Sequence, residues 1–183
     1  MKLEDSGLGC QLPCYPLVSE GLLPTPPASL ARKIKLFIRR RMSPTRERAL
    51  KNRTNRWMNR IAELRGEPTR PTAPPETLAA TNLQAGDVVR VRSKEEIEAT
   101  LNHWRQLKGC GFMPEMEGYC GTTQRVLKRV ERFVDERDLL VKKARGIVFL
   151  DGVFCQGTAD FGPCDRTCYF FWREEWLEKV GED

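Results

Sequence analysis

Apolar residues recur at helical spacing from residue 29 onward, and this pattern predicts a first helix. Leu30, Ile34, Phe37 and Ile38 fall on one face, because residues three and four apart are neighbours on a helix. Lysine and arginine fill most other positions, and Ser29 stands where an N-cap residue is expected. The pattern is typical of an amphipathic helix with a strongly basic polar face.

A second helix is predicted directly after the first. Ser43 is a suitable N-cap, and Pro44 fits the first helical position because that position needs no backbone N–H donor. Gly66 offers a stop at the other end. Four apolar residues form one stripe along this helix: Leu50, Trp57, Ile61 and Leu64. The stretch 29–66 is therefore predicted to be a helical arm.

Segments without such periodicity flank the arm. Residues 1–28 are rich in glycine and proline and are expected to range from extended to disordered. Residues 67–82 contain four prolines and are predicted to form a semi-extended linker. We therefore expect four parts: a flexible segment at 1–28, the helical arm at 29–66, the linker at 67–82 and a compact domain at 83–183.

The compact domain opens with a turn and a short strand at 88–92, Val-Val-Arg-Val-Arg. Ser93 and Glu96 have the spacing of a capping box, and apolar residues at helical spacing extend the predicted helix to Gly109. The stretch 111–121 lacks periodicity and is predicted to be a loop.

Residues 124–135 are ambiguous, because their apolar spacing fits a helix while their β-branched content fits a bent strand. Residues 146–152 predict a buried strand, with 153–155 as its candidate continuation. A further core strand is expected at 169–172. A short amphipathic helix from Arg173 would then turn Trp176 and Val180 inward.

Composition narrows the class of protein. Hydrophobic residues make up 40% of the 183 residues, enough for a core, and the mean hydropathy is negative. No apolar run approaches the roughly 18 residues of a membrane span, and no apolar signal-peptide core follows the N-terminus. A cytoplasmic location is expected by default, where the seven cysteines would stay reduced.

The net charge of +6 is unevenly distributed. Residues 29–70 hold fourteen Lys and Arg against three Asp and Glu, while the rest of the chain is mildly acidic. Such a basic arm favours an anionic partner, namely nucleic acid, a membrane surface or an acidic protein face; a solvated helical face is the alternative. The residues expected to contact an anion are Arg39, Arg40, Arg41, Arg46, Lys51, Arg53, Arg56 and Arg60.

Four cysteines are candidate metal ligands: Cys120, Cys155, Cys164 and Cys168. Four thiolates would form a closed tetrahedral site, so structural zinc is expected, with an iron–sulfur cluster as the alternative. Cys110 is a reserve ligand. Cys10 and Cys14 have a C-x3-C spacing and are predicted to be partly exposed thiols, with a second metal site as the other interpretation.

Catalytic motifs are scarce. The chain has no Gly-x-Ser-x-Gly, no phosphate-cradling glycine loop and no HExxH, and its one histidine, His103, is expected to be a surface or partly packed side chain. Glu115 is the candidate catalytic carboxylate, because it lies in the distinctive loop with a methionine on either side; a hydrogen-bonded loop glutamate is the alternative.

Several motifs of the domain resemble a little-characterised bacterial family whose members are often encoded among biosynthetic genes such as glycosyl- and methyltransferases. They are Pro114-Glu115-Met116-x2-Tyr119-Cys120-Gly121, Arg125-Val126-x-Lys128-Arg129, Cys155-x8-Cys164-x3-Cys168 and Phe171-Trp172-x-Glu174-x-Trp176-Leu177. The opening at 86–92 and the strand spacing also resemble small SH3-like barrels, as in KOW-type modules. The resemblance covers roughly residues 84–180 and leaves out the arm.

The resemblance implies a mostly β (α+β) fold: a small SH3-like barrel with one inserted helix and a metal clasp of cysteines. It also implies that 124–135 are strand. Members of the family tend to carry another cysteine and a histidine where this chain has Val134 and Asp160-Phe161. That departure still leaves four cysteines, the number that structural zinc requires.

Two functions from different classes follow. In the first, the protein is a non-catalytic binding or accessory module: its barrel docks a protein partner, a biosynthetic enzyme, and its arm holds an anionic surface. In the second, it is a metalloenzyme, or the catalytic subunit of one, in natural-product or sugar biosynthesis, with its chemistry at Glu115 and the cysteine site. The sequence favours binding, because no nucleophile–base pair is visible.

Overall fold

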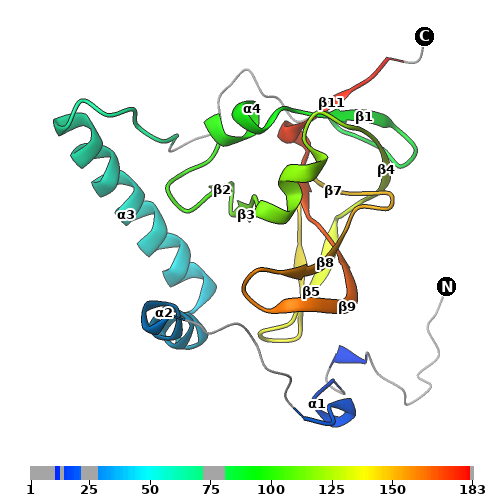
Figure 1. The fold of residues 1–183 in the computed structure, drawn as a ribbon, viewed down its shortest axis with the longest axis horizontal. Coiled ribbons are helices and arrows are strands. Elements are labelled where there is room, and N and C mark those ends of the chain that lie inside the picture. Colours follow the sequence, from blue (N-terminus) through cyan, green and yellow to red (C-terminus); the bar gives the residue numbers. More distant parts are fainter. Residues whose placement is uncertain (1–10, 13–14, 22–28, 72–80, 182–183) are drawn as a thin grey trace.

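The computed structural model describes residues 11–12, 15–21, 29–71 and 81–181. In these ranges, helices precede a body built from antiparallel strands (Figure 1). Most of the predicted N-terminal segment, with Cys10 and Cys14, and most of the proline-rich linker lie outside the described residues. Among the described residues, no helix combines the length and the apolar character needed to cross a bilayer.

Both predicted helices of the arm are confirmed. After the short α1 (Tyr15–Val18), the chain forms α2 (Leu30–Arg41) and α3 (Pro44–Leu64). The side chain of Ser43 caps α3 by accepting a hydrogen bond from Arg46 N, and Pro44 occupies the first turn. Local sequence signals therefore define where α3 begins.

A five-stranded antiparallel sheet forms the centre of the body. Its strands, in spatial order, are β10 (Trp172–Arg173), β7 (Ile147–Leu150), β4 (Thr123–Arg129), β1 (Val88–Val91) and β11 (Leu177–Lys179). The protein is thus a mixed α and β protein with a main antiparallel sheet. In the described residues the sheet does not close into a barrel, so the SH3-like barrel stays a prediction.

Three hairpins extend from this sheet. They are β2 (Gln106–Leu107) with β3 (Cys110–Gly111), β5 (Arg132–Asp135) with β6 (Leu140–Lys143), and β8 (Phe154–Thr158) with β9 (Gly162–Tyr169). The ambiguous stretch 124–135 lies within β4 and β5, which confirms the strand interpretation. A continuous strand through 153–155 is wrong, because a turn at Gly152 (φ 67°) separates β7 from β8.

The helix predicted to run to Gly109 ends ten residues earlier, as α4 (Lys94–Ala99). Its capping box between Ser93 and Glu96 is confirmed. Beyond it Arg105 and Lys108 adopt positive φ angles of 52° and 49°, which a helix cannot accommodate, and the chain turns into the β2–β3 hairpin. The predicted loop then contains a 3₁₀ helix, η2 (Pro114–Tyr119).

The helix predicted from Arg173 is also wrong. One 3₁₀ turn, η3 (Glu174–Trp176), leads into β11, where Leu177 pairs with Val91 of β1. Pairing with β1 satisfies the backbone groups that a helix would have satisfied internally. Trp176 is fully buried as expected, but Val180 is 39% exposed.

The core lies between the sheet and the segment that crosses it from α4 to η2. The rings of Phe112 and Trp176 meet edge to face at 5.6 Å, and Trp176 Nε1 donates to Thr100 Oγ1 at 3.1 Å. Both the apolar body and the polar tip of this tryptophan are therefore satisfied. The core fixes α4, η2 and the C-terminal strand against one another.

Candidate functional site

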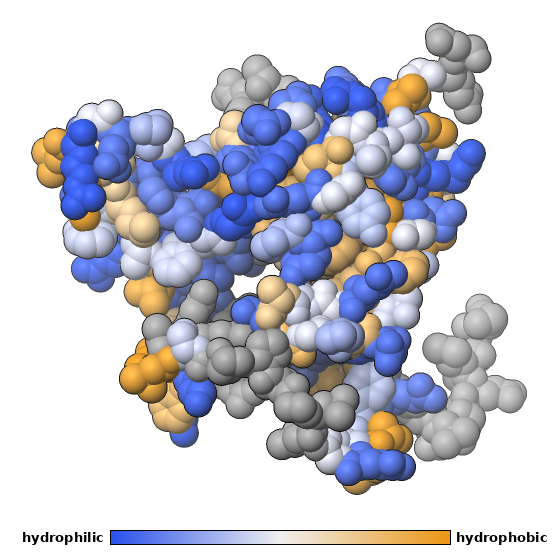
Figure 2. All heavy atoms as spheres, viewed as in Figure 1, coloured by the Kyte–Doolittle hydropathy of each residue, from blue (hydrophilic) through white to orange (hydrophobic). Residues whose placement is uncertain are grey.

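The apolar face of α2 is exposed along its length. Leu30 is 73% exposed, Phe37 60%, and Ile34 and Ile38 about half. The guanidinium of Arg41 lies 3.8 Å from the centre of the Phe37 ring, in cation–π contact. Figure 2 shows hydrophobic surface over α2 beside strongly hydrophilic atoms. Within the described residues, this helix presents its apolar stripe and its charges together to the outside.

Most of the apolar stripe of α3 is also exposed, although Ile61 is half-buried. Leu50, Trp57 and Leu64 are 49%, 64% and 88% exposed. An apolar stripe usually faces a core, so its exposure needs a partner or another explanation. Arg46 and Arg53 are exposed on the same helix and form no ion pair within the described residues.

The face that α3 turns to the body is polar. Asn55 Oδ1 accepts from His103 N at 3.0 Å, and Asn59 binds both the N–H and the C=O of Arg70 at 3.0 and 2.7 Å. His103 Nε2 lies 2.8 Å from Asn59 Oδ1, an oxygen that only accepts, so Nε2 carries the proton. Burial, followed by the charge of Arg70, lowers the pKa of His103. His103 thus helps to attach α3 to the body, and its side chain is partly buried as predicted.

The predicted anion-binding residues divide by position. Arg41, Arg46, Arg53, Arg56 and Arg60 are exposed on α2 and α3. Lys51 differs, because its Nζ pairs with Glu47 at 2.8 Å and donates to Gln106 at 3.4 Å on the body side. Arg39 and Arg40 lie on α2, and their side chains are outside the described part of the structure.

Three of the predicted metal ligands share the β8–β9 hairpin. Cys155 and Cys168 are directly opposite in the register, and Cys164 lies further along β9. A Cβ on Gly157 would lie 2.2 Å from the carbonyl oxygen of Gly162, so only glycine permits this close approach of the two strands. Gly157 therefore maintains the register that sets Cys155 against Cys168.

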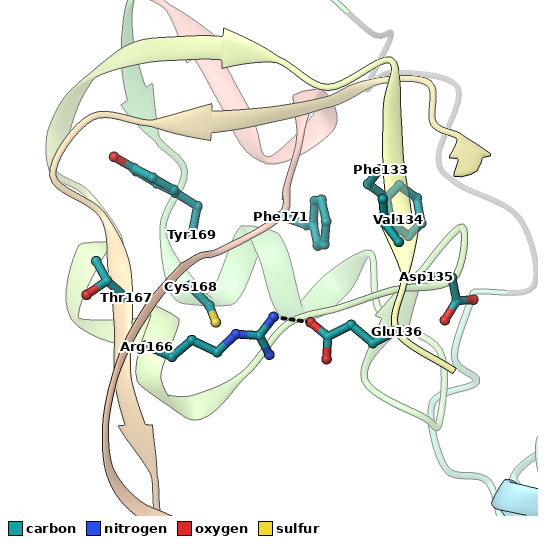
Figure 3. Close-up of a pocket in the computed structure, with 9 residues that line it drawn as sticks. All are labelled: Phe133, Val134, Asp135, Glu136, Arg166, Thr167, Cys168, Tyr169 and Phe171. Atoms are coloured by element: carbon teal, nitrogen blue, oxygen red, sulfur yellow. Dashed lines mark hydrogen bonds and ion pairs between the residues drawn. The ribbon is translucent and has the colours of Figure 1, made fainter. Parts of the chain in front are cut away.

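The thiol of Cys168 faces a hollow of about 480 Å³ between β5 and β9 (Figure 3). Arg166 and Glu136 form an ion pair across it, and the sulfur points toward this pair. Burial raises the pKa of Cys168, and the neighbouring Cys164 and Cys155 also raise it, whereas Arg166 opposes them. Cys164 and Cys155 therefore lie close enough to Cys168 to act on its pKa.

The other two candidate ligands lie on different elements. Cys120 caps η2, and burial raises its pKa, with Glu117 and Glu95 adding to the effect. Burial raises the pKa of Cys110 to about 12, and its Sγ donates to Phe171 O at 3.2 Å. Within the described residues, no three His, Cys, Asp or Glu side chains are arranged as ligands of a metal ion. Thiols with raised pKa values are also weak nucleophiles near neutral pH.

Glu115, the candidate catalytic residue, lies on η2. One carboxylate oxygen accepts from Ala159 N at 3.3 Å, and the other is buried without a hydrogen-bond partner in the described structure. The first contact joins η2 to the β8–β9 hairpin, which is the structural alternative named for this residue. Glu115 lines neither the hollow of Cys168 nor the larger groove beside it.

Sequence reasoning missed that larger groove, of about 740 Å³, between α3, the β2–β3 hairpin and β6. Its cations come from segments far apart in the chain, including Arg48, Lys143 and Arg145. It also missed the buried Glu175 and its two cationic partners, the buried Arg173 and the exposed Lys108. The one available signal was the charged Arg-Glu-Glu run between Trp172 and Trp176.

Comparisons with known proteins found no relative of this chain. No family model, no curated protein and no solved structure matches the chain.

Proposed function

We propose that this protein is a non-catalytic binding module that attaches to an anionic lipid surface through the outward faces of α2 and α3. The observation that carries the proposal is the exposure of both apolar stripes among arginines. Seven large apolar side chains are at least 49% exposed there: Leu30, Ile34, Phe37, Ile38, Leu50, Trp57 and Leu64.

Lipid fits these two helices better than nucleic acid does. An amphipathic helix with Lys and Arg beside Leu, Ile, Phe and Trp buries its apolar face at the headgroup boundary and attracts anionic lipids. Each basic residue near an anionic leaflet contributes roughly 1 kcal/mol. Nucleic acid would use the arginines but would leave the aliphatic side chains of Ile34 and Leu64 in water.

The way in which α3 is attached to the body supports lipid binding as well. Because Asn55, Asn59 and Ala62 are the residues that α3 buries, the exposed side chains of its apolar stripe are available for a partner. An ion pair between Glu47 and Arg137, at 3.3 Å, adds to the contacts that attach α3 to the body.

The finer features of the fold belong to the same proposal. Structural zinc would be held by Cys155, Cys164 and Cys168 of the β8–β9 hairpin together with Cys120, four ligands that leave no open catalytic position. The SH3-like barrel, its protein partner and a cytoplasmic location stay predictions of the sequence. The catalytic alternative at Glu115 would require turnover that Glu115→Gln abolishes.

Vesicle flotation tests lipid attachment. We expect the protein to float with phosphatidylcholine vesicles that contain phosphatidylserine, and much less with phosphatidylcholine alone. Phe37→Ser and Trp57→Ser should each weaken binding by about tenfold, since burying one such side chain is worth about 1.5 kcal/mol or more. Arg53→Glu should weaken it too, and added salt should weaken binding of the unaltered protein.

Matched variants make this experiment decisive. Val141 is 66% exposed on β6, and Lys128 is exposed on β4, so Val141→Ser and Lys128→Glu repeat the same changes elsewhere on the surface. Both should float normally. Binding that Phe37→Ser and Trp57→Ser leave unchanged would overturn the proposal. Oligonucleotide binding that these helix variants weaken, with no flotation, would assign the arm to nucleic acid.

A further inference from the structure

The groove beside α3 has an unbalanced charge. Five cations line it, and no Asp or Glu does. Lys108 and Arg173 both bind the buried Glu175, at 2.6 Å from Lys108 and at 2.9 and 2.7 Å from Arg173. A single carboxylate therefore partly balances two of the five cations that line the groove.

The remaining three cations are available to a ligand. Arg48 on α3, Lys143 on β6 and Arg145 after it are exposed, and their side chains form no hydrogen bond or ion pair within the described residues. They come from two separate parts of the chain that border the same groove, α3 and the end of the β5–β6 hairpin. Unpaired cations around a concavity raise the local concentration of anionic ligands.

Aromatic rings form another part of the wall. Phe171 and Tyr169 are 38% and 37% exposed. Behind them, the ring of Phe149 lies 5.3 Å from Tyr169 and 5.4 Å from Phe171, and Phe133 is a further 5.4 Å neighbour of Phe171. The exposed rings are therefore held by their neighbours and offer a preformed surface on which a planar group can stack.

The groove continues into the hollow of Cys168. The two share Phe133, Cys168, Tyr169 and Phe171 as lining residues (Figure 3). The hollow contains the acidic residues Asp135 and Glu136, but Arg137 and Arg166 pair with them, so the extension does not repel an anion. The combined space is longer than the groove alone.

We propose that this groove binds a nucleotide, with its phosphate at Arg48, Lys143 and Arg145 and its base stacked on Phe171 or Tyr169. The groove would recognise a phosphate joined to a planar ring, a feature that a free nucleotide and a single-stranded nucleic acid share. A volume of about 740 Å³ accommodates a ligand of this size. The site is separate from the outward faces of α2 and α3 and does not depend on attachment to lipid.

Binding measurements on the full chain test the site. Fluorescence anisotropy measures binding of a labelled single-stranded oligonucleotide. Calorimetry measures binding of nucleoside mono- and diphosphates. We expect Phe171→Leu to raise the Kd roughly tenfold or more, since loss of a stacked base has about this effect. Lys143→Ala with Arg145→Ala should raise the Kd and flatten its salt dependence.

The controls separate the site from general charge. Lys128→Ala removes an exposed cation from β4, outside the groove, and should leave the Kd unchanged. Phe37→Ser, which tests the lipid surface, should also leave it unchanged. Near-ultraviolet circular dichroism of each variant verifies its fold. Phe171→Leu keeps an apolar side chain at that position, so its fold is expected to survive.

Each outcome decides a point. Equal affinity for mononucleotide and oligonucleotide identifies a free nucleotide as the ligand, while binding of the oligonucleotide alone identifies a single strand. Absence of binding in both measurements would overturn the proposal. It would also be overturned if Lys128→Ala weakened binding as much as the groove variants do. Lipid flotation is measured separately, so failure of the groove proposal and failure of lipid attachment are distinguishable.

Discussion

At the scale of single residues, buried polar side chains determine how the parts of this protein are joined. Glu175 is the clearest case, because it is fully buried yet bound by two cations, Arg173 and Lys108. The cations come from β10 and from the turn between β2 and β3, so Glu175 links the sheet to the groove. A buried charge of this kind is tolerated only with such partners.

We expect Glu175→Gln to lower the free energy of unfolding by about 3 kcal/mol at pH 7, because it leaves the buried Arg173 without its charged partner. Burial raises the pKa of Glu175, but hydrogen bonds from Arg173 and Lys108 outweigh burial and bring the pKa below its ordinary value of 4.5. A lowered carboxyl pKa stabilises the fold above that value, and this stability is lost as the pH falls through the folded-state pKa.

Urea unfolding across the pH range measures this effect. The difference between the unaltered protein and Glu175→Gln should be largest near pH 7 and should shrink as the pH falls below about 4.5. Glu178→Gln is the matched control, because Glu178 forms a half-exposed ion pair with Arg90 and should matter little. A difference that stays constant with pH would contradict the role assigned to the Glu175 charge.

At the scale of elements, the sequence was sufficient to predict where a helix begins when a local capping residue sets that position. The Ser43-Pro44 start of α3 and the Ser93 capping box of α4 are both found in the structure, because caps act within four residues. The ends of elements were less accessible. Termination of α4 at Ala99 depends on the β2–β3 hairpin, and replacement of the predicted C-terminal helix depends on β1, a strand far away in sequence.

The orientation of α3 could not be read from its apolar stripe. Periodicity identifies a face but does not say what that face contacts, and here Asn55, Asn59 and Ala62 are the residues that α3 buries. For the same reason, the groove was not foreseen. Arg48 and Lys143 are 95 positions apart in the chain, and only the tertiary fold brings them to one cavity.

The β8–β9 hairpin yields a prediction at this scale. Elemental analysis of protein purified without added metal should find one zinc per chain, and Cys155→Ser and Cys168→Ser should each lose it. Cys110→Ser is the comparison, because Cys110 is only the reserve ligand and its thiol donates to Phe171 O instead, so this variant should retain the metal. A brown, iron-containing protein would support the cluster alternative, and metal content unchanged in Cys168→Ser would contradict a clasp on this hairpin.

At the scale of the whole molecule, α3 separates two surfaces of different chemistry. Its outer face, with α2, combines arginines with exposed apolar side chains, and its inner side borders the aromatic, cationic groove. A protein held on an anionic bilayer by the first surface would keep the second available to a soluble ligand. The basic stretch at 29–70 contributes the arginines of the first surface and Arg48 of the second.

The central claim, attachment by the outer face, is tested most directly by the fluorescence of Trp57. This tryptophan is 64% exposed, whereas Trp172 and Trp176 are fully buried and Trp104 is partly buried with its Nε1 bound to Lys51 O. Vesicles of phosphatidylserine and brominated phosphatidylcholine should shift the emission to the blue and quench it, and Trp57→Phe should remove both changes. Emission that the vesicles leave unaltered, or quenching that persists in Trp57→Phe, would contradict the account.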